Sequence, residues 1–181
     1  IEQKTSANDR KDMKVIGNSL PRYNYNFGIS ADWYGIDFSV LFQGIGKQNW
    51  YPGAETSMFW GPYSRPYASF IPSDFMSQVW SEENTNAYFP RPRGYVALGS
   101  NRELAVVNTK YLQNLAYCRL KNLSIGYTLP DKWLSKIGFE KIRVYFSGEN
   151  LLTFTKLHSD YIDPEQASAS NSWKTSKSDA N

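Results

Sequence analysis

Three acidic side chains in the last quarter of the sequence are the first group whose types and spacing suggest chemistry. Asp160, Asp163 and Glu165 offer the carboxylate oxygens that calcium prefers, but their spacing is not that of an EF-hand loop, so a solvated surface turn is favoured. The single histidine, His158, and the single cysteine, Cys118, cannot by themselves form a zinc site or an internal disulfide. No serine carries a nucleophile motif. We therefore expect no catalytic residue, no metal, no cofactor and no enzyme activity.

A second group consists of aromatic and arginine side chains gathered in residues 44–116. Planar rings stack on sugar faces and bury a large area at small entropic cost, and Tyr, Trp and Arg dominate contact hot spots. The group contains Trp50, Tyr51, Phe59, Trp60, Tyr63, Tyr67, Phe70, Trp80, Tyr88, Phe89, Tyr95, Arg65, Arg91 and Arg93. A long loop also needs a small core of its own, which is expected to take about two-thirds of these rings. The predicted contacts with a substrate or partner are Trp50, Tyr51, Trp60 and Tyr63.

Segments of alternating character flank these residues and must hold them in place. In residues 22–33, aromatic and apolar side chains occupy the odd positions, while Asn, Gly, Ser and Asp follow Arg22 at the even positions. Successive side chains of a strand point to opposite faces. The same alternation predicts strands at about 36–43, 117–129 and 141–150, with Leu41 as an exception. Each strand then has one apolar face and one polar face.

Two short helical turns are expected between these strands. One follows Pro130 and ends at Gly138, with Trp133, Leu134 and Ile137 on one side. Ser73 is expected to cap the other, which carries its large apolar side chains on one face. These side chains are Phe75, Met76, Val79 and Trp80.

The connections between the strands alternate in length. Those at 32–35 and 131–140 are short, whereas 44–116 is long and rich in proline and glycine. Compact domains usually join elements with about 4 to 6 residues, whereas outer-membrane barrels systematically pair short periplasmic turns with long surface loops. The pattern therefore favours an all-β fold whose antiparallel strands belong to a membrane barrel, with the apolar faces toward lipid.

Composition narrows the function classes. Twenty Lys and Arg residues are scattered among 17 Asp and Glu residues, so the net charge of +3 forms no basic stripe and nucleic acid is not an expected partner. A soluble β-sandwich that binds carbohydrate is the alternative, but it should show about seven short, evenly spaced strands. A glycan-degrading enzyme would need a pair of acidic residues across a cleft, and the sequence contains no recognisable pair of this kind.

Three stretches carry a family resemblance. The sequences YCRLKNLSIGYTLP at 117–130 and RVYFSGENLLTFT at 143–155 resemble the C-terminal part of SusC/RagA-type TonB-linked outer-membrane transporters. The sequence KVIGNSLPRY at 14–23 is similar to the family's lead into an earlier barrel strand. The three stretches occur in the family's order and together span most of the chain.

The resemblance implies a barrel of 22 strands with a plugged lumen. It implies a TonB-energised importer of oligosaccharides or peptides in the outer membrane of a Gram-negative bacterium, with a SusD-like surface lipoprotein as partner. Residues 1–181 would then be a C-terminal fragment of the barrel domain, without the plug, the segment that contacts TonB or the last strand. The segments 1–21, 44–116 and 151–181 would be surface loops.

The resemblance also assigns directions to individual side chains. Arg143, Tyr145 and Glu149 are expected to face the lumen, where they could contact the plug. Arg119 and Lys121 share the apolar parity of their strand but lie near its outer end, so they are expected to reach the lipid headgroups.

Overall fold

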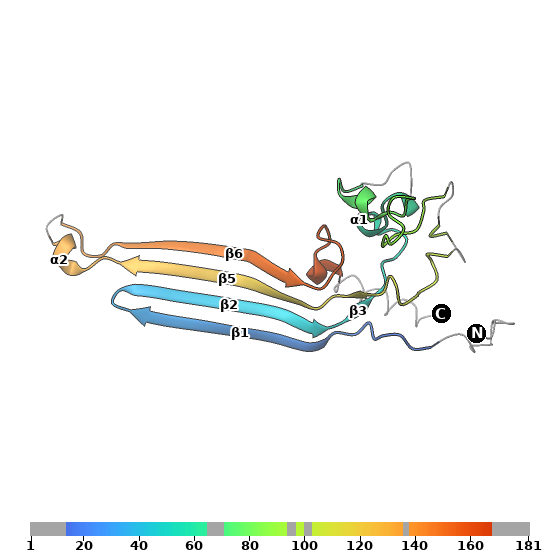
Figure 1. Cartoon of the computed structure of the whole chain (residues 1–181). Helices are drawn as coiled ribbons and strands as arrows, with labels where there is room; N and C mark the ends of the chain where they lie inside the picture. Colours follow the sequence, from blue (N-terminus) through green and yellow to red (C-terminus); the bar gives the residue numbers. More distant parts are fainter. Residues whose placement is uncertain (1–13, 65–70, 94–96, 100–102, 136–137, 168–181) are drawn as a thin grey trace. The chain divides into compact units, whose positions relative to one another are not determined.

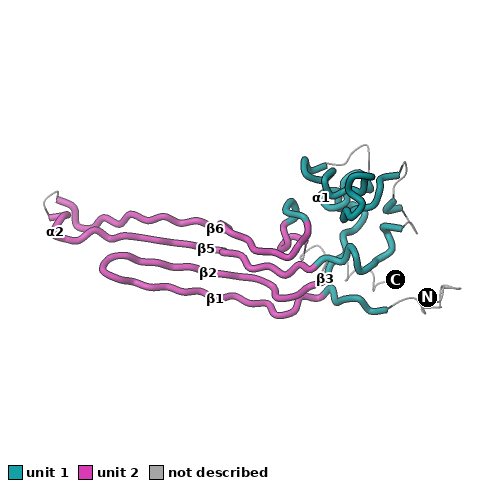
Figure 2. The backbone as a smooth tube through the Cα atoms, viewed as in Figure 1, with its two compact units in different colours: residues 1–19, 49–113, 159–162 teal, residues 20–48, 114–158, 163–181 magenta. Residues whose placement is uncertain are grey.

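The computed structural model describes residues 14–64, 71–93, 97–99, 103–135 and 138–167. Five side chains with expected roles lie outside these residues, namely Arg65, Tyr67, Phe70, Tyr95 and Ile137. The chain divides into two compact units, coloured separately in Figure 2. Unit 1 consists of Ile1–Ser19, Asn49–Gln113 and Ser159–Ile162, and unit 2 consists of Leu20–Gln48, Asn114–His158 and Asp163–Asn181.

Unit 2 contains four long antiparallel strands in one sheet, in the order β1-β2-β5-β6 (Figure 1). They are β1 (Arg22–Trp33), β2 (Ile36–Lys47), β5 (Tyr117–Thr128) and β6 (Arg143–Thr155). The β1–β2 turn and α2 (Asp131–Leu134) lie at one end of the sheet, called the turn end below. The opposite end is called the loop end. The prediction of antiparallel strands with short connections at one end is confirmed.

The apolar face of this sheet is exposed. Side chains that face each other in an antiparallel pair lie on the same side, so the registers Phe38↔Ile125 and Ile125↔Phe146 extend one apolar surface across β2, β5 and β6. The exposed fractions of its larger members include Phe27 50%, Ile29 59%, Ile125 43%, Val144 63% and Phe146 59%. A folded chain that leaves so many neighbouring apolar side chains open needs something else to cover them.

The turn between β1 and β2 shows why the chain reverses there. Trp33 pairs with Ile36, which leaves a loop of only Tyr34 and Gly35. Their φ values are +46° and +86°. Positive φ at both central residues is the requirement of a type I′ turn, whose twist matches that of the flanking strands. Glycine takes this conformation without steric cost.

Strand β2 extends to Lys47, beyond the predicted range 36–43, because Gly44 is a strand residue and not a breaker. A Cβ atom at Gly44 would lie 2.6 Å from Cζ of Tyr25, so the absence of a side chain leaves room for that ring. The Tyr25 hydroxyl donates a hydrogen bond of 2.8 Å to the carbonyl of Tyr117 on β5. The ring of one strand therefore covers the glycine of the next.

Two irregularities near the loop end interrupt the pairing of the strands, and the one in β5 reverses the two faces of that strand. Lys121 is an extra residue of β5 relative to β2, and β6 bulges next to it at Asn150, whose φ is +54°. One extra residue moves every later side chain to the other face. Leu120 therefore lies on the apolar face, opposite Leu152, and Arg119 lies on the polar face.

The predicted position of Arg119 at the lipid headgroups is thus wrong, because counting alternate positions through a bulge gives the opposite face. The irregularity in β6 explains the predicted end of the last strand. Pairing with β5 is interrupted at Asn150, where the prediction ended the strand, but it resumes with Leu152↔Leu120 and continues to Thr155.

Unit 1 has an aromatic core held by irregular chain. Its short elements are β3 (Asn49–Trp50), α1 (Ser57–Trp60), η1 (Gly61–Tyr63) and η2 (Phe75–Gln78), and β3 pairs with β4 (Gln113–Asn114). Trp60 is 0% and Phe89 2% exposed. The Phe59 and Trp60 rings meet edge to face with centroids 4.9 Å apart, and the Trp60 indole donates a hydrogen bond of 2.9 Å to the carbonyl of Pro52. The loop therefore has its own core.

The expected helical turns are present but short. η2 follows Asp74 and has no side-chain cap, so the predicted capping role of Ser73 is wrong. It ends before Val79, whose extended backbone forms a bridge with Phe89. At the turn end, Leu134 is 1% exposed and Gly138 has a φ of +77°. Among the described residues, no helix is long and apolar enough to cross a membrane.

Replacing Trp60 by alanine should destabilise unit 1. The indole is fully buried and hydrogen-bonded, so its loss should cost about 3–5 kcal/mol of unfolding free energy. Met58→Ala on the same helix is the matched control, because Met58 is 38% exposed. Limited proteolysis of the full-length protein should show faster cleavage within 49–113 for Trp60→Ala only. Equal cleavage rates for the two variants would contradict the proposed core.

Candidate functional site

The polar face of the sheet is the first place where functional side chains gather. Arg143, Tyr145 and Glu149 alternate along β6 and pair with Thr128, Gly126 and Asn122 of β5. The structure therefore brings the three predicted lumen-facing residues onto one face, opposite the exposed apolar surface.

An ion pair crosses this face near the turn end. Nε of Arg143 donates to Oδ1 of Asp37 at 3.0 Å, and Nη2 donates to Oδ2 at 2.5 Å. Such a two-point contact is stronger and more directional than a single hydrogen bond. The guanidinium also lies 5.4 Å from the centre of the Tyr145 ring. Sequence reasoning identified Arg143 but missed its partner Asp37.

Gly126 is the residue that permits this pair. Asp37 belongs to β2 and Arg143 to β6, so the pair spans the intervening strand β5. A Cβ atom at Gly126 would lie 2.5 Å from Oδ1 of Asp37 and 2.8 Å from Nη2 of Arg143. The sequence contained a signal for this ion pair. A glycine lies in the middle strand, and residues of opposite charge lie near the ends of the two neighbouring strands.

The predicted contact residues of the long loop are mostly interior. Trp50 is 8%, Trp60 0% and Tyr63 4% exposed. These three rings therefore pack inside the loop, which was the alternative to their predicted contact with a substrate or partner. The Tyr63 hydroxyl donates a short hydrogen bond to the carbonyl of Pro90.

Tyr51 is the fourth predicted contact and is only partly buried. Its hydroxyl donates to the carbonyl of Leu104 at 2.8 Å and accepts from Nδ2 of Asn108 at 3.0 Å. Burial raises the pKa of Tyr51 to about 12, although the Asn108 hydrogen bond acts in the other direction. The hydroxyl is therefore neutral at physiological pH and holds two parts of the loop together.

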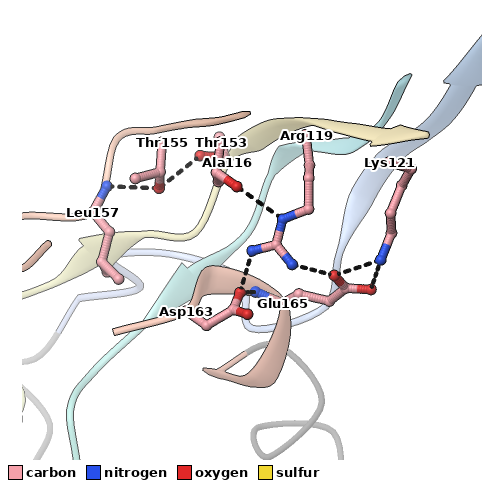
Figure 3. A network of polar contacts seen from close by, with 8 residues as sticks. All are labelled: Ala116, Arg119, Lys121, Thr153, Thr155, Leu157, Asp163 and Glu165. Atoms are coloured by element: carbon pink, nitrogen blue, oxygen red, sulfur yellow. Dashed lines mark hydrogen bonds and ion pairs between the residues drawn. The ribbon is translucent and has the colours of Figure 1, made fainter. Parts of the chain in front are cut away.

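A second charged network lies at the loop end of the polar face (Figure 3). Arg119, 8% exposed, donates through Nη2 to Oδ1 of Asp163 at 2.6 Å and through Nη1 to Oε2 of Glu165 at 2.7 Å. Its Nε donates to Oγ1 of Thr153 on β6 at 2.9 Å. Nζ of Lys121 reaches the same Glu165 carboxylate at 3.0 Å. The network fastens the segment after β6 to the bulged part of β5.

This network explains the acidic residues that the sequence first suggested as calcium ligands. Burial raises the pKa of Asp163, but hydrogen bonds from Arg119 and from backbone N–H groups outweigh it and hold that pKa below the ordinary value. Two of the three carboxylates are thus paired with cations. The described residues contain no group of three or more His, Cys, Asp or Glu side chains that could hold a metal ion. The arrangement serves to anchor a segment.

The acid sensitivity of this anchor can be tested with Asp163→Asn. Because the folded state lowers the pKa of Asp163, the charged carboxylate stabilises the fold above the ordinary value of 3.8, and this contribution is lost as the pH falls through the lowered pKa. The difference in melting temperature between the unmodified protein and Asp163→Asn should be largest near neutral pH and should narrow below about pH 4. Calorimetry of the full-length protein in detergent measures it.

Asp160→Asn is the matched control for this test, because Asp160 is an exposed carboxylate outside the Arg119 network. It should change the melting temperature little at any pH. An Asp163→Asn effect that is independent of pH would argue against the ionic anchor.

Known proteins share sequence and fold with this chain. No protein-family model matches the sequence. The chain is 35% identical over 156 residues to TonB-dependent receptor P3 of Formosa agariphila, a match that covers 85% of this chain and 14% of the receptor. TonB-dependent receptor P26 of the same organism is 28% identical over 156 residues, with the same two coverages. The chain therefore spans only about a seventh of the length of these curated relatives.

Solved structures share the fold. The RagAB peptide transporter matches with a TM-score of 0.57 and 22% identity, covering 88% of this chain and 17% of that one. The RagAB peptide importer in its open-open state matches with a TM-score of 0.52 and 23% identity, covering 84% and 15%. These matches are consistent with the long antiparallel strands and the single apolar face of the sheet. The chain is similar in sequence to a segment of TonB-dependent receptors and shares its fold with part of the RagAB transporter.

Proposed function

We propose that the chain forms part of the barrel wall and surface loops of an active transporter in the outer membrane of a Gram-negative bacterium. The transporter imports oligosaccharides or peptides, draws energy through TonB and works with a SusD-like surface lipoprotein. The observation that carries the proposal is the two-faced sheet, whose apolar side is open and whose polar side bears the Arg143–Asp37 pair. Hydrocarbon covers such an apolar side in a membrane barrel, and all strand edges are paired once the barrel closes.

Exposed aromatic side chains support the orientation of the sheet. Trp33, Tyr34, Trp133 and Phe139 at the turn end are 69%, 87%, 60% and 60% exposed. Aromatic side chains are enriched at membrane interfaces, where amphipathic rings such as Trp and Tyr have one apolar part and one polar part. On this proposal the turn end faces the periplasm, and the long connections face the outside of the cell.

The remaining parts of the machine lie elsewhere in the polypeptide on this proposal. Residues 1–181 form a C-terminal fragment of the barrel domain, and the plug, the segment that contacts TonB and the last strand belong to other residues. Arg143, Tyr145 and Glu149 face the lumen and the plug. Trp50, Trp60 and Tyr63 keep the shape of the surface loop, while Tyr51 lies nearer to the lipoprotein or the ligand.

The rival reading, a soluble carbohydrate-binding β-sandwich, is not favoured by this geometry. A sandwich packs the apolar faces of two sheets together at about 10 Å. Here the apolar face of the four-stranded sheet carries side chains that are about half exposed or more, such as Phe27 at 50% and Val144 at 63%.

Neighbouring lysine substitutions can test whether lipid covers the apolar face. Ile125 and Ser124 are adjacent in β5 and point to opposite faces. Lysine on a lipid-facing side near the bilayer centre should cost about 2–4 kcal/mol of unfolding free energy, whereas a lumen-facing lysine should cost far less. Denaturant titration of the full-length protein in lipid vesicles compares Ile125→Lys with Ser124→Lys. If Ile125→Lys were the milder change, lipid could not be the covering layer.

Uptake by intact cells tests the transport function itself. Cells that lack the transporter, and cells that keep it but lack TonB, should accumulate neither labelled oligosaccharides nor labelled peptides of the imported class, while the corresponding monomers enter normally. The physical reason is that an oligomer too large for general porins needs an energised pore. Accumulation that continues without TonB would contradict active import.

A further inference from the structure

We infer that a hollow on the polar face at the loop end binds an extended peptide that carries negative charge. The inference rests on the proposed import function and names the substrate class and the residues that recognise it. The hollow has a volume of about 470 Å³ and lies on β1, β2 and β5. Its recognition groups are Asn24 and Asn26 of β1 and Gln43 of β2, and Tyr117 of β5 forms part of its wall.

Three carboxamides provide the hydrogen-bonding groups of the hollow. Asn26 pairs directly with Gln43, and Asn24 lies two residues along β1 on the same face. Both asparagines are exposed, and Gln43 is half-buried. Within the described residues, none of the three side chains has a hydrogen-bond partner. Each carboxamide offers donors and an acceptor, as a peptide group does.

The spacing of these amides fits an extended peptide. Residues two apart on a strand are separated by roughly 6.6 Å, because each residue advances the chain by about 3.3 Å. An extended peptide presents its own same-side backbone groups at that interval. A peptide lying along β1 can therefore repeat the same hydrogen bonds at Asn24 and Asn26.

The hollow is lined by two tyrosines, and neither is an open platform for a sugar ring, since the ring of Tyr25 covers Gly44 of the next strand. Tyr117 is only 5% exposed, and the guanidinium of Arg119 lies 5.7 Å from the centre of its ring. Stacking of a sugar needs an exposed ring face. The hollow therefore favours recognition by hydrogen bonds over recognition by stacking.

Two cations that neighbour the lining residues along β1 and β2 indicate the charge of the ligand. Arg22 and Lys47 are paired directly across β1 and β2, and both are exposed. Like charges in this position repel one another. Among the described residues, neither has a carboxylate partner, in contrast to Arg119, which is paired with Asp163 and Glu165. A carboxylate of the bound peptide would relieve this repulsion.

Binding measurements on the full-length transporter in detergent test the inference. The probes are three labelled ten-residue peptides with blocked ends, made of Ala, Ser and Gly and carrying either no charge, three Asp or three Lys. A glucan oligomer and an oligogalacturonate of similar length serve as sugar probes. The acidic peptide should bind more tightly than the neutral one, and the basic peptide should bind most weakly.

Substitutions separate the two parts of the site. Asn26→Ala and Gln43→Ala should each weaken the acidic and the neutral peptide by about tenfold, the loss expected for a hydrogen bond. Lys47→Gln should remove the preference for the acidic peptide and leave the neutral peptide unchanged. Ser30→Ala is the matched control, because Ser30 lies on the same face of β1 outside the hollow. All four positions lie on the polar surface, and unchanged melting temperatures show that the variants fold.

The possible results distinguish this inference from the proposed function. Unchanged peptide affinity in Asn26→Ala and Gln43→Ala would overturn the inference. Tight binding of a sugar oligomer without peptide binding would also overturn it, while the import function would stand. Failure to bind any probe, together with failure to import any oligomer, would defeat both proposals.

Discussion

The alternation of side chains along β-strands is the constraint on which the structure depends. Every residue of β1, β2, β5 and β6 belongs either to the open apolar face or to the polar face, and hydrogen bonding between the strands allows no third choice. A bulge is the one local device that can exchange the two faces. By inserting it near the loop end of β5, the chain places Arg119 among polar partners while Leu120 continues the apolar surface beside Leu152.

The long loop obeys a different rule. It has few strand pairs, so its shape comes from contacts between rings, with Trp60 and Phe89 near the centre. Hydroxyl groups of tyrosines such as Tyr51 satisfy backbone carbonyls at the edge of this core. The aromatic content of the loop is therefore explained first by packing. Fully buried rings such as Trp60 have no surface left for contact with another molecule.

Sequence reasoning found the features that depend on local periodicity. The range of β1 was predicted as observed, and so were the faces of Ile125 and Val144, because uninterrupted alternation carries that information. It failed where one residue breaks the period, as at Lys121 of β5, and it could not foresee that Arg119 meets Asp163, since 44 residues separate them. Burial of Trp60 was equally inaccessible, because composition does not distinguish a ring in a core from a ring on a surface.

The bridge over Gly126 has a consequence for how relatives of this chain can diverge. Asp37, Gly126 and Arg143 come from three neighbouring strands, and the ion pair can form across the middle strand only if the residue between the two charges has no side chain. A larger residue at position 126 would displace both charged side chains. Without one of the two charges, position 126 no longer needs to be glycine. The three positions should therefore vary together across homologous sequences, as a correlated triplet that links strands whose pairing they do not themselves create.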